Sequence, residues 1–557
     1  MVDLITTLAL VFISAGALLL IANHFSLSSV PFYILAGILV GGFIDQPELL
    51  ELAQWGIAFL VFVFGVSLDF SSLGTVIRDG EIMTGVQLLV IGPLSFVVGL
   101  LLGLVPLDAL YFSVAATLSS TIVGTGLRKA DIRENLVHGR LAKSVHFLQD
   151  ILAVGLILVL STEAFMADNI AMKIGYGVML LAAAGIVHRY LFDLFSRLAE
   201  DSQELMLMTS ISILIVFLAA AEFIGLSIVV GAFAAGLAIK REVSNLGMLN
   251  GIESIKDFFA AIFFVTIGAL VSPPTIDVFI VSLTLIVLTA VLKPLVMVFT
   301  LIWEGYDART ASLTSLSLDQ VSEFALFIAI GALIEGVISS TLFDAIILAA
   351  ALTMITSAYT RKHDNQLYDR LLRHLVGRAQ TRKIDERSRI NTPEDHVIIA
   401  GFGRQGRRIA HACREAGREC VVIENDPAML DSLAEQCDNY VFGDAMGRYT
   451  WEKAGINEAS LVVSTINQRP VSERILDFDA GDMILRADDA ADARALLDRG
   501  ALYVAVPDIL ASDQLADRVS KVIEDPDSTR EVEPEHRAEL RTLSELGFSS
   551  LANEDPA

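Results

Sequence analysis

Apolar residues dominate the first 360 positions and gather into runs of about 15 to 26 residues, separated by short polar stretches. A helix needs roughly 20 apolar residues to cross the hydrocarbon core of a bilayer, and fewer if it is broken or interfacial. The pattern predicts thirteen membrane-spanning helices, centred at residues 4–22, 29–43, 53–68, 83–104, 109–127, 141–161, 172–188, 203–222, 224–239, 257–271, 276–301, 309–333 and 337–357.

The pattern changes near residue 396, where short apolar runs alternate with amphipathic stretches. This alternation is typical of parallel strands joined by helices. HVIIA, ECVVIE, NYVF and LVVSTI read as four strands, and the helix after the fourth, in VSERILDF, looks shortened. We predict a polytopic α-helical membrane domain followed by an α/β Rossmann-like domain, divided into a transmembrane domain (1–360), a basic linker (361–395), a nucleotide-binding domain (396–520) and an acidic tail (521–557).

Composition supports this division. Only 14 of the 40 Lys and Arg residues lie in the first 360 positions, and the chain is 54% apolar with 19% charged residues. The net charge of −25 disfavours a nucleic-acid partner. All three cysteines lie after residue 400 and have no metal-like CxxC spacing, which fits a reducing cytosol.

The basic residues also predict the orientation of the spans. With the N-terminus outside, alternate loops collect twelve Lys and Arg residues, whereas the opposite loops hold only Lys173. Cytoplasmic loops carry the excess of basic residues. We therefore expect an inner-membrane protein, surrounded by lipid, with an external N-terminus and a cytoplasmic C-terminal domain.

Two of the predicted spans, 109–127 and 309–333, carry Ser/Thr clusters with Gly or acidic residues in otherwise apolar runs. In lipid such groups must be paired internally or must line a cavity. These are the fifth and twelfth segments, and an offset of seven places them in opposite orientation. Matching helix breaks in two inverted halves are a sequence sign of a transporter's midplane site.

Ionisable residues inside spans are functional candidates, because a charge at mid-bilayer costs about 2.5–3.5 kcal/mol or more. Asp150 is the only acid in its segment, and ten apolar positions follow it. Lys293 is a cation within a span, directly before Pro294. It is either a transport residue or a structural one, which forms a permanent ion pair or compensates the dipoles at the helix breaks. Asp319 and Glu323 are four positions apart, so we expect them to share one helix face.

In the soluble part, GFGRQG stands between a predicted strand and an amphipathic helix, and an acid, Glu424, ends the next strand. This arrangement favours dinucleotide-type binding, in which glycines let the backbone approach a pyrophosphate and the acid holds ribose hydroxyls. A Rossmann shape without nucleotide is the alternative.

The membrane part resembles the Kef-type cation/proton antiporters (cation:proton antiporter-2 family) through SSTIVGTGL, HFLQDILAV, GAFAAGLAI, FFVTIGALV and SEFALFIAI. The resemblance implies an inverted repeat of thirteen helices in which broken helices five and twelve cross. It also implies that Asp150 binds the ion and the proton beside Gln149, that Lys293 is the lysine of helix eleven, and that the crossing contains Ser119, Ser120, Thr121 and Glu323. The Gln149–Asp150 pair is more similar to potassium-selective members than to sodium ones.

The soluble part resembles the RCK (TrkA-N-like) domain through GFGRQG, IEND and GDA. The resemblance implies a homodimer regulated by an adenine nucleotide, with AMP, NAD(H) and ATP left open, and it allows an unidentified cytosolic regulatory partner. It implies a nucleotide site formed by Gly401, Gly403, Arg404, Gln405, Gly406, Glu424 and Asp444.

Together these features predict a non-enzymatic antiporter exchanging a monovalent cation, K⁺ or alternatively Na⁺, for H⁺ under nucleotide control. A second class is an RCK-gated potassium channel, because TIVGTG resembles a channel filter. A filter is assembled from four such loops, however, and this chain has one copy, without the aromatic residue. A dehydrogenase is disfavoured, since no substrate domain or catalytic constellation follows the nucleotide fold.

Overall fold

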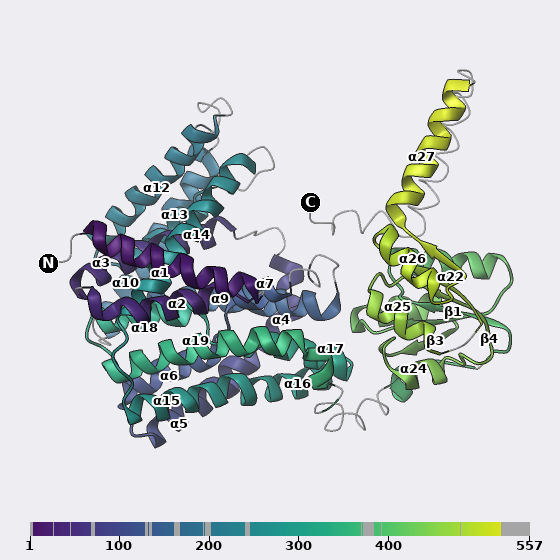
Figure 1. The fold of residues 1–557 in the computed structure, drawn as a ribbon, viewed down its shortest axis with the longest axis horizontal. Helices are drawn as coiled ribbons and strands as arrows, with labels where there is room; N and C mark the ends of the chain where they lie inside the picture. The colour runs from purple at the N-terminus through teal and green to yellow at the C-terminus, as the bar shows by residue number, and fades with distance from the viewer. Residues whose placement is uncertain are drawn as a thin grey trace. The chain divides into compact units, whose positions relative to one another are not determined.

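The computed structural model describes residues 4–524, apart from 26, 45, 68–72, 129–131, 133–135, 161–166, 193, 195–201, 240–245, 369, 371–383, 392 and 479–480. The chain forms two compact units, one of residues 1–304 and 309–374 and one of residues 305–308 and 375–557. Over its described residues the first unit is helical, and the second contains the β-sheet (Figure 1).

The helices of the first unit follow the apolar runs of the sequence, and each of the thirteen predicted segments is helical over most of its described residues. In chain order they are α1 (Leu4–His24), α2 (Ser29–Val40) with η1 (Gly41–Phe43), α3 (Gln46–Ser67), α4 (Leu73–Val86), η3 (Gln87–Ile91), α5 (Gly92–Leu101), α6 (Pro106–Thr117), α7 (Thr121–Leu127), α9 (Val137–Leu160), α10 (Ala167–Ile186) with η4 (Val187–Leu191), α12 (Gln203–Phe223), α13 (Ile228–Leu237), α14 (Leu246–Ala269), α15 (Ile276–Val287), η6 (Leu288–Leu292), α16 (Lys293–Glu304), α17 (Ala308–Ser315), η7 (Leu316–Leu318), α18 (Glu323–Ile334), α19 (Ser340–Lys362) and α20 (Asp364–Leu367).

Three helices begin well before the predicted runs. The segments expected at 53–68, 83–104 and 257–271 start at Gln46, Leu73 and Leu246. The stretches before the predicted runs contain polar residues, which lower the local hydropathy without interrupting the helix. An apolar run therefore marks the part of a helix that fits a bilayer core, not the whole helix.

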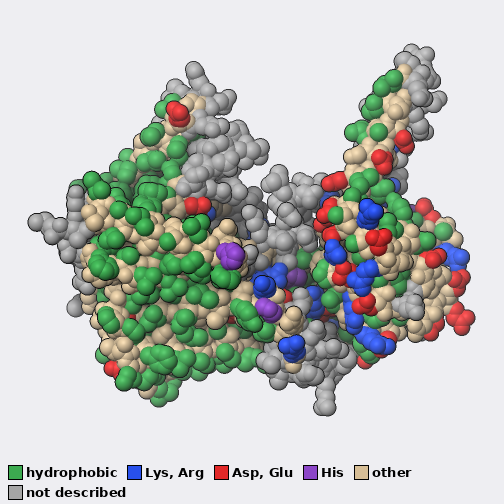
Figure 2. Space-filling view, viewed as in Figure 1, with side chains coloured by type: hydrophobic (Ala, Val, Ile, Leu, Met, Phe, Trp, Pro, Cys, Tyr) green, Lys and Arg blue, Asp and Glu red, His purple; other side chains and the backbone are tan. Residues whose placement is uncertain are grey.

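The helices have the length and surface of membrane spans. Among the described residues, eight helices are long and apolar enough to cross a membrane, and two shorter apolar ones are also present. The remaining predicted spans lie on α9, α10 and α14, which are 20 to 24 residues long. Large apolar side chains such as Leu89 and Trp303 are exposed at 74% and 77%, and Figure 2 shows apolar side chains covering this face of the unit.

Both predicted helix breaks are present. α6 ends at Thr117 and α7 begins at Thr121, while η7 ends at Leu318 and α18 begins at Glu323. The fourth and eleventh spans each contain a π-helical turn, η3 and η6, which precedes α5 and α16. The interruptions therefore occur in corresponding spans of the two halves, as an inverted repeat requires.

The second unit contains a sheet of six parallel strands in the order β3-β2-β1-β4-β5-β6 (Figure 1). This is the dinucleotide-binding order, in which ligands bind beyond the carboxyl ends of the strands where the order reverses. The elements are β1 (His396–Ala400), α22 (Arg404–Glu415), β2 (Cys420–Glu424), η9 (Pro427–Met429), α23 (Leu430–Gln436), β3 (Asn439–Phe442), α24 (Arg448–Lys453), β4 (Ala459–Ser464), α25 (Arg469–Leu476), β5 (Asp482–Arg486), α26 (Ala490–Asp498), β6 (Tyr503–Ala505) and α27 (Pro507–Glu524).

The interior of the sheet explains its topology. All five residues of β1 are buried, because a central parallel strand is covered on both faces. The four expected strands are confirmed, and the helix after β4 is indeed short, at eight residues against twelve in α22. β5 and β6 were not predicted, and α27 extends past residue 520. The acidic tail lies outside the described residues from position 525 onward.

Candidate functional site

The two helix breaks meet at one place, which we call the crossing and define as residues 118–120 and 319–322. The Ser119 hydroxyl donates a hydrogen bond to the carbonyl of Leu318 (3.0 Å), and the Gln320 amide donates to the carbonyl of Ser120 (3.1 Å). These bonds satisfy backbone groups that lose their helical partners at a break. Polar side chains of one break therefore hold the backbone of the other.

Asp150 of α9 lies against the first break. Its side chain is 2% exposed, and its Oδ1 accepts a hydrogen bond of 2.6 Å from the Thr121 hydroxyl. Oε1 of the neighbouring Gln149 accepts a bond of 2.9 Å from the backbone N–H of Ser119. The predicted acid, its amide neighbour and the hydroxyl at the start of α7 are thus brought together.

Gln149 also donates from its amide nitrogen to the side-chain oxygen of Gln87, which lies in the π-helical turn η3. Gln87 is fully buried. The sequence analysis missed this residue, although a lone glutamine in the apolar run 83–104 was an available signal. Gln149 is therefore oriented from both sides, by Ser119 and by Gln87, while remaining uncharged at every pH.

Glu323 is the first residue of α18, and its side chain also contacts the start of α7. Its Oε1 accepts a hydrogen bond of 3.0 Å from the backbone N–H of Ile122. Helix N-termini carry a partial positive charge that a carboxylate stabilises. Glu323 also lies close enough to Asp150 for the two carboxyl groups to interact electrostatically.

Lys293 lies at the C-terminal ends of the half-helices that precede the two breaks. Its ammonium nitrogen donates to the carbonyl of Leu118 (3.3 Å) and to the carbonyl of Gln320 (3.4 Å), and the side chain is fully buried. Both carbonyls follow the C-terminal ends of half-helices, where the dipole is negative. This geometry supports the alternative in which Lys293 compensates helix dipoles.

Asp319 and Glu323 do not share a helix face, and that expectation was wrong. The helix is interrupted between them, so their four-residue spacing carries no helical periodicity. Asp319 accepts a hydrogen bond of 2.7 Å from the hydroxyl of Thr360 on α19 and lies within electrostatic range of Lys293. Glu323 instead contacts α7, as described above.

The hydroxyls of Ser119 and Ser120 have partners within the protein. Ser119 donates to Leu318, and the Ser120 oxygen caps α7 by accepting from the N–H of Val123 (3.2 Å). An N-cap of this kind stabilises a helix by about 1 kcal/mol. Of the three predicted hydroxyls, only that of Thr121 is bonded to Asp150, and their role as cation ligands stays a prediction.

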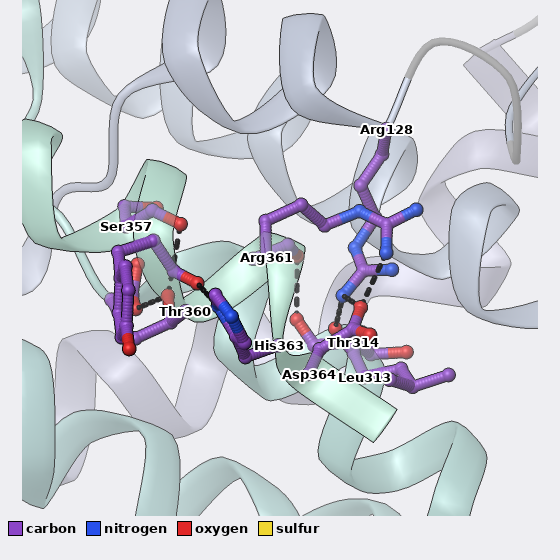
Figure 3. A network of polar contacts seen from close by, with 11 residues as sticks. Arg128, Leu313, Thr314, Ser357, Thr360, Arg361, His363 and Asp364 are labelled. Carbon is purple, nitrogen blue, oxygen red and sulfur yellow. Dashed lines mark hydrogen bonds and ion pairs between the residues drawn. The ribbon is translucent and has the colours of Figure 1, made fainter. Parts of the chain in front are cut away.

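A second polar network lies at the other end of α7 (Figure 3). Arg128, which is one of the twelve basic residues expected in the alternate loops, is 1% exposed and donates to the carbonyl of Leu313. Its guanidinium lies 3.5 Å from the carboxylate of Asp364, which also pairs with Arg361. The sequence offered no pattern for this network, because its members come from three separate segments.

The predicted nucleotide loop joins β1 to α22. Gly401 has φ of +91°, a conformation that favours glycine. A Cβ at Gly406 would lie 1.9 Å from the carbonyl oxygen of Gly401, so this glycine is needed for the helix to approach the loop. A Cβ at Gly403 would meet no atom within 4 Å. The backbone at Gly403 is thus open to a ligand at the N-terminus of α22.

Glu424 lies at the end of β2, beside this loop. Its carboxylate accepts hydrogen bonds from the backbone N–H groups of Phe402 (2.7 Å), Asn425 (2.8 Å) and Asp426 (2.9 Å). Burial raises the pKa of Glu424 above its ordinary value of 4.5, although the backbone N–H groups oppose the shift. An ionised carboxylate can accept about four hydrogen bonds, so capacity for a ribose hydroxyl remains.

The other predicted nucleotide residues lie along the same edge of the sheet. Arg404 and Gln405 begin α22 and are exposed, and the Gln405 oxygen accepts a bond of 3.3 Å from Arg486. Asp444 follows β3, where its carboxylate accepts from the N–H of Met446 (2.9 Å). The sheet thus gathers the glycine loop, Glu424 and Asp444 at the carboxyl ends of β1, β2 and β3.

Interrupted, crossed helices around a buried carboxylate, joined to a Rossmann-type domain, define a secondary transporter with a regulatory domain. Two family models match the chain, the transmembrane sodium/hydrogen exchanger over residues 8–362 and the TrkA-N domain over residues 397–507. The chain belongs to the sodium/hydrogen exchanger family, and it is a cation/proton antiporter with a C-terminal TrkA-N domain. The predicted family resemblance is confirmed.

Curated relatives match the chain over most of its length. The glutathione-regulated potassium-efflux system protein KefC of Klebsiella pneumoniae is 27% identical over 504 residues, covering 84% of this chain and 76% of the relative. The KefC protein of Salmonella schwarzengrund is 26% identical over 489 residues, covering 82% and 75%. The sodium proton antiporter MjNhaP1 of Methanocaldococcus jannaschii, a solved structure, is 17% identical with a TM-score of 0.48 and covers 66% of this chain and 98% of that one.

Proposed function

We propose that this antiporter exchanges K⁺ for H⁺ across the inner membrane and that Asp150 binds the two alternately. The observation that carries the proposal is the buried Asp150 carboxylate, bonded to the Thr121 hydroxyl and adjacent to the neutral Gln149. Burying an ionised carboxylate without a counter-charge costs free energy. States in which Asp150 holds either a proton or a cation are therefore favoured. One group that holds either ligand but not both couples their movements.

The choice of K⁺ has two supports. The KefC relatives are named as potassium-efflux proteins. In addition, the residue directly before Asp150 is the amide Gln149, so this position contributes a neutral oxygen and not a second adjacent carboxylate. Such a site has a weaker field than a pair of acids, and a weaker field favours the larger and less strongly hydrated cation. Na⁺ remains the competing ion.

The ion is tested by reconstituting the purified full-length protein in liposomes and measuring proton flux with a pH-sensitive dye. K⁺, Na⁺ and Li⁺ are supplied in turn. We expect K⁺ to support the fastest flux at equal concentration. Faster flux with Na⁺ identifies a sodium antiporter, and K⁺ flux that needs no opposing proton gradient, with unitary currents in planar bilayers, identifies a channel.

We further propose that the TrkA-N domain binds an adenine nucleotide as a regulator and does not consume it. Gly403 leaves the N-terminus of α22 open, and Glu424 stands at the position that holds a ribose. No basic side chain occupies that position in ECVVIENDP, which disfavours a 2′-phosphate. The domain is cytoplasmic in this proposal, the N-terminus of the chain is external, and two copies form a homodimer.

A further inference from the structure

The contacts around Arg128 connect the transport site to the end of the membrane unit. Arg128 caps the C-terminal end of α7, a helix of seven residues and about 10 Å whose first residue, Thr121, holds Asp150. Arg128 and Thr121 thus lie at the two ends of one short helix, so we expect a displacement of Arg128 to shift the hydroxyl that is bonded to Asp150.

The partners of Arg128 lie in α17, which belongs to the second interrupted span, and in α20, near the C-terminal end of the membrane unit. The guanidinium donates to the carbonyl of Leu313 in α17 and pairs with Asp364 in α20, at 3.5 Å. Asp364 is 3% exposed in its side chain and also binds Arg361 (Figure 3).

The last turns of α19 add two bonds to the second break. Ser357 donates to the side-chain oxygen of Gln320 (3.0 Å), and Thr360 donates to Asp319 (2.7 Å). Gln320 in turn donates to the carbonyl of Ser120. Both interrupted spans are therefore bonded to residues 357–364. In the sequence, these residues precede the segment that leads to the TrkA-N domain.

We propose that Arg128 and Asp364 are positioning residues for cation/proton exchange, and that nucleotide binding acts on exchange through their ion pair. Separating two charges that are buried together is costly, so the pair favours a discrete arrangement over intermediate ones. An element with two discrete arrangements is what energetic coupling between distant sites requires. The second half of this proposal rests on the nucleotide regulation proposed above.

The experiment compares full-length wild type, Asp364→Asn and Arg361→Gln in proteoliposomes, with and without AMP, NAD⁺ or ATP. Arg361→Gln is the matched control, because it removes the other cation that binds Asp364 but from a side chain that is 27% exposed. We expect Asp364→Asn to change the apparent cation affinity or turnover about fivefold or more without nucleotide, and Arg361→Gln to change neither. We also expect the ratio of rates with and without nucleotide to approach 1 in Asp364→Asn.

Nucleotide binding to each variant is measured separately by calorimetry on the full-length protein. If wild type binds no nucleotide or does not respond to it, the proposed regulation fails, and the positioning role is judged by the basal exchange alone. Basal exchange in Asp364→Asn that equals wild type overturns the positioning role. An unchanged nucleotide response with intact binding overturns the coupling. If Asp364→Asn does not fold, the conservative pair Asp364→Glu and Arg128→Lys is measured in the same way, and wild-type kinetics in both contradict the proposal.

Discussion

Lys293 and Glu323 occupy electrically opposite ends of the same pair of broken helices. The Lys293 ammonium donates to the carbonyls of Leu118 and Gln320, which follow the ends of two half-helices, whereas Glu323 accepts from Ile122 at the start of α7 and itself begins α18. Each charge thus faces two helix ends of opposite sign to its own. We therefore expect Lys293 and Glu323 to hold the crossing as fixed charges and Asp150 to be the acid that changes partner.

Replacing Lys293 with methionine should destabilise the membrane unit. The substitution removes the donor that Leu118 and Gln320 share and leaves their carbonyls buried, at a cost of about 1–3 kcal/mol for an unsatisfied group. We expect a clearly lower unfolding temperature in detergent. Lys256→Met is the control, because Lys256 is 37% exposed and its pairing with Asp257 contributes little. Equal unfolding temperatures for Lys293→Met and wild type would show that dipole compensation is unimportant.

Exchange should be electroneutral, with one cation for one proton. The Lys293 ammonium donates to two carbonyls, which favour its charged form, and we expect it to stay charged through the cycle so that only the ligand of Asp150 changes. A potential-sensitive dye in K⁺-loaded proteoliposomes should show no voltage while the pH dye reports exchange. A sustained, protonophore-sensitive voltage would mean that a second charge moves in each cycle.

Replacing Gly403 with valine should abolish nucleotide binding without unfolding the domain. A Cβ at this position meets no protein atom within 4 Å, so the side chain fits the nucleotide-free protein but fills the space above the N-terminus of α22. Nucleotide should raise the melting temperature of the wild type by mass action and leave that of Gly403→Val unchanged. A normal increase in the melting temperature of Gly403→Val would mean that the nucleotide binds at another site.

Nucleotide affinity should fall on acidification because of Glu424. The carboxylate must be ionised to accept from ribose, and burial raises its pKa above 4.5, so protonation begins at a higher pH than in an exposed glutamate. Affinity is thus highest above the raised pKa and decreases as the pH falls through it. Calorimetry from about pH 8 to about pH 5 checks this. Glu424→Gln should weaken binding and flatten the profile, whereas Glu452→Gln, an exposed control, should alter neither.

Much of the architecture could be predicted because it depends on strong local patterns. Bilayer thickness imposes the apolar runs, and the Ser/Thr clusters mark backbone that has lost its helical partners. The glycine loop was recognisable because Gly401 and Gly406 meet steric demands that other residues do not. β5 and β6 escaped notice because one begins with Asp482 and the other has three residues.

The parts that could not be predicted depend on contacts between distant segments. Composition indicated that a break exists in 309–333 but not its position, and the spacing of Asp319 and Glu323 was therefore misread. Gln87 is a single amide in an apolar run and Gln320 is one of several polar residues around the second break, and no periodicity indicates the contacts that either makes. The burial of Arg128 depends on Asp364, which is 236 positions later in the chain.

The central claim is that Asp150 carries both the cation and the proton. It is tested by cation-driven proton flux through purified Asp150→Asn in proteoliposomes. Asp344→Asn is measured beside it, because Asp344 is another buried acid of the same unit, bonded to the Ser272 N–H at 3.4 Å and outside the crossing. We predict that Asp150→Asn is folded and binds nucleotide but exchanges no cation for protons, while Asp344→Asn retains exchange. Cation/proton exchange by Asp150→Asn at a rate comparable to wild type would contradict the mechanism.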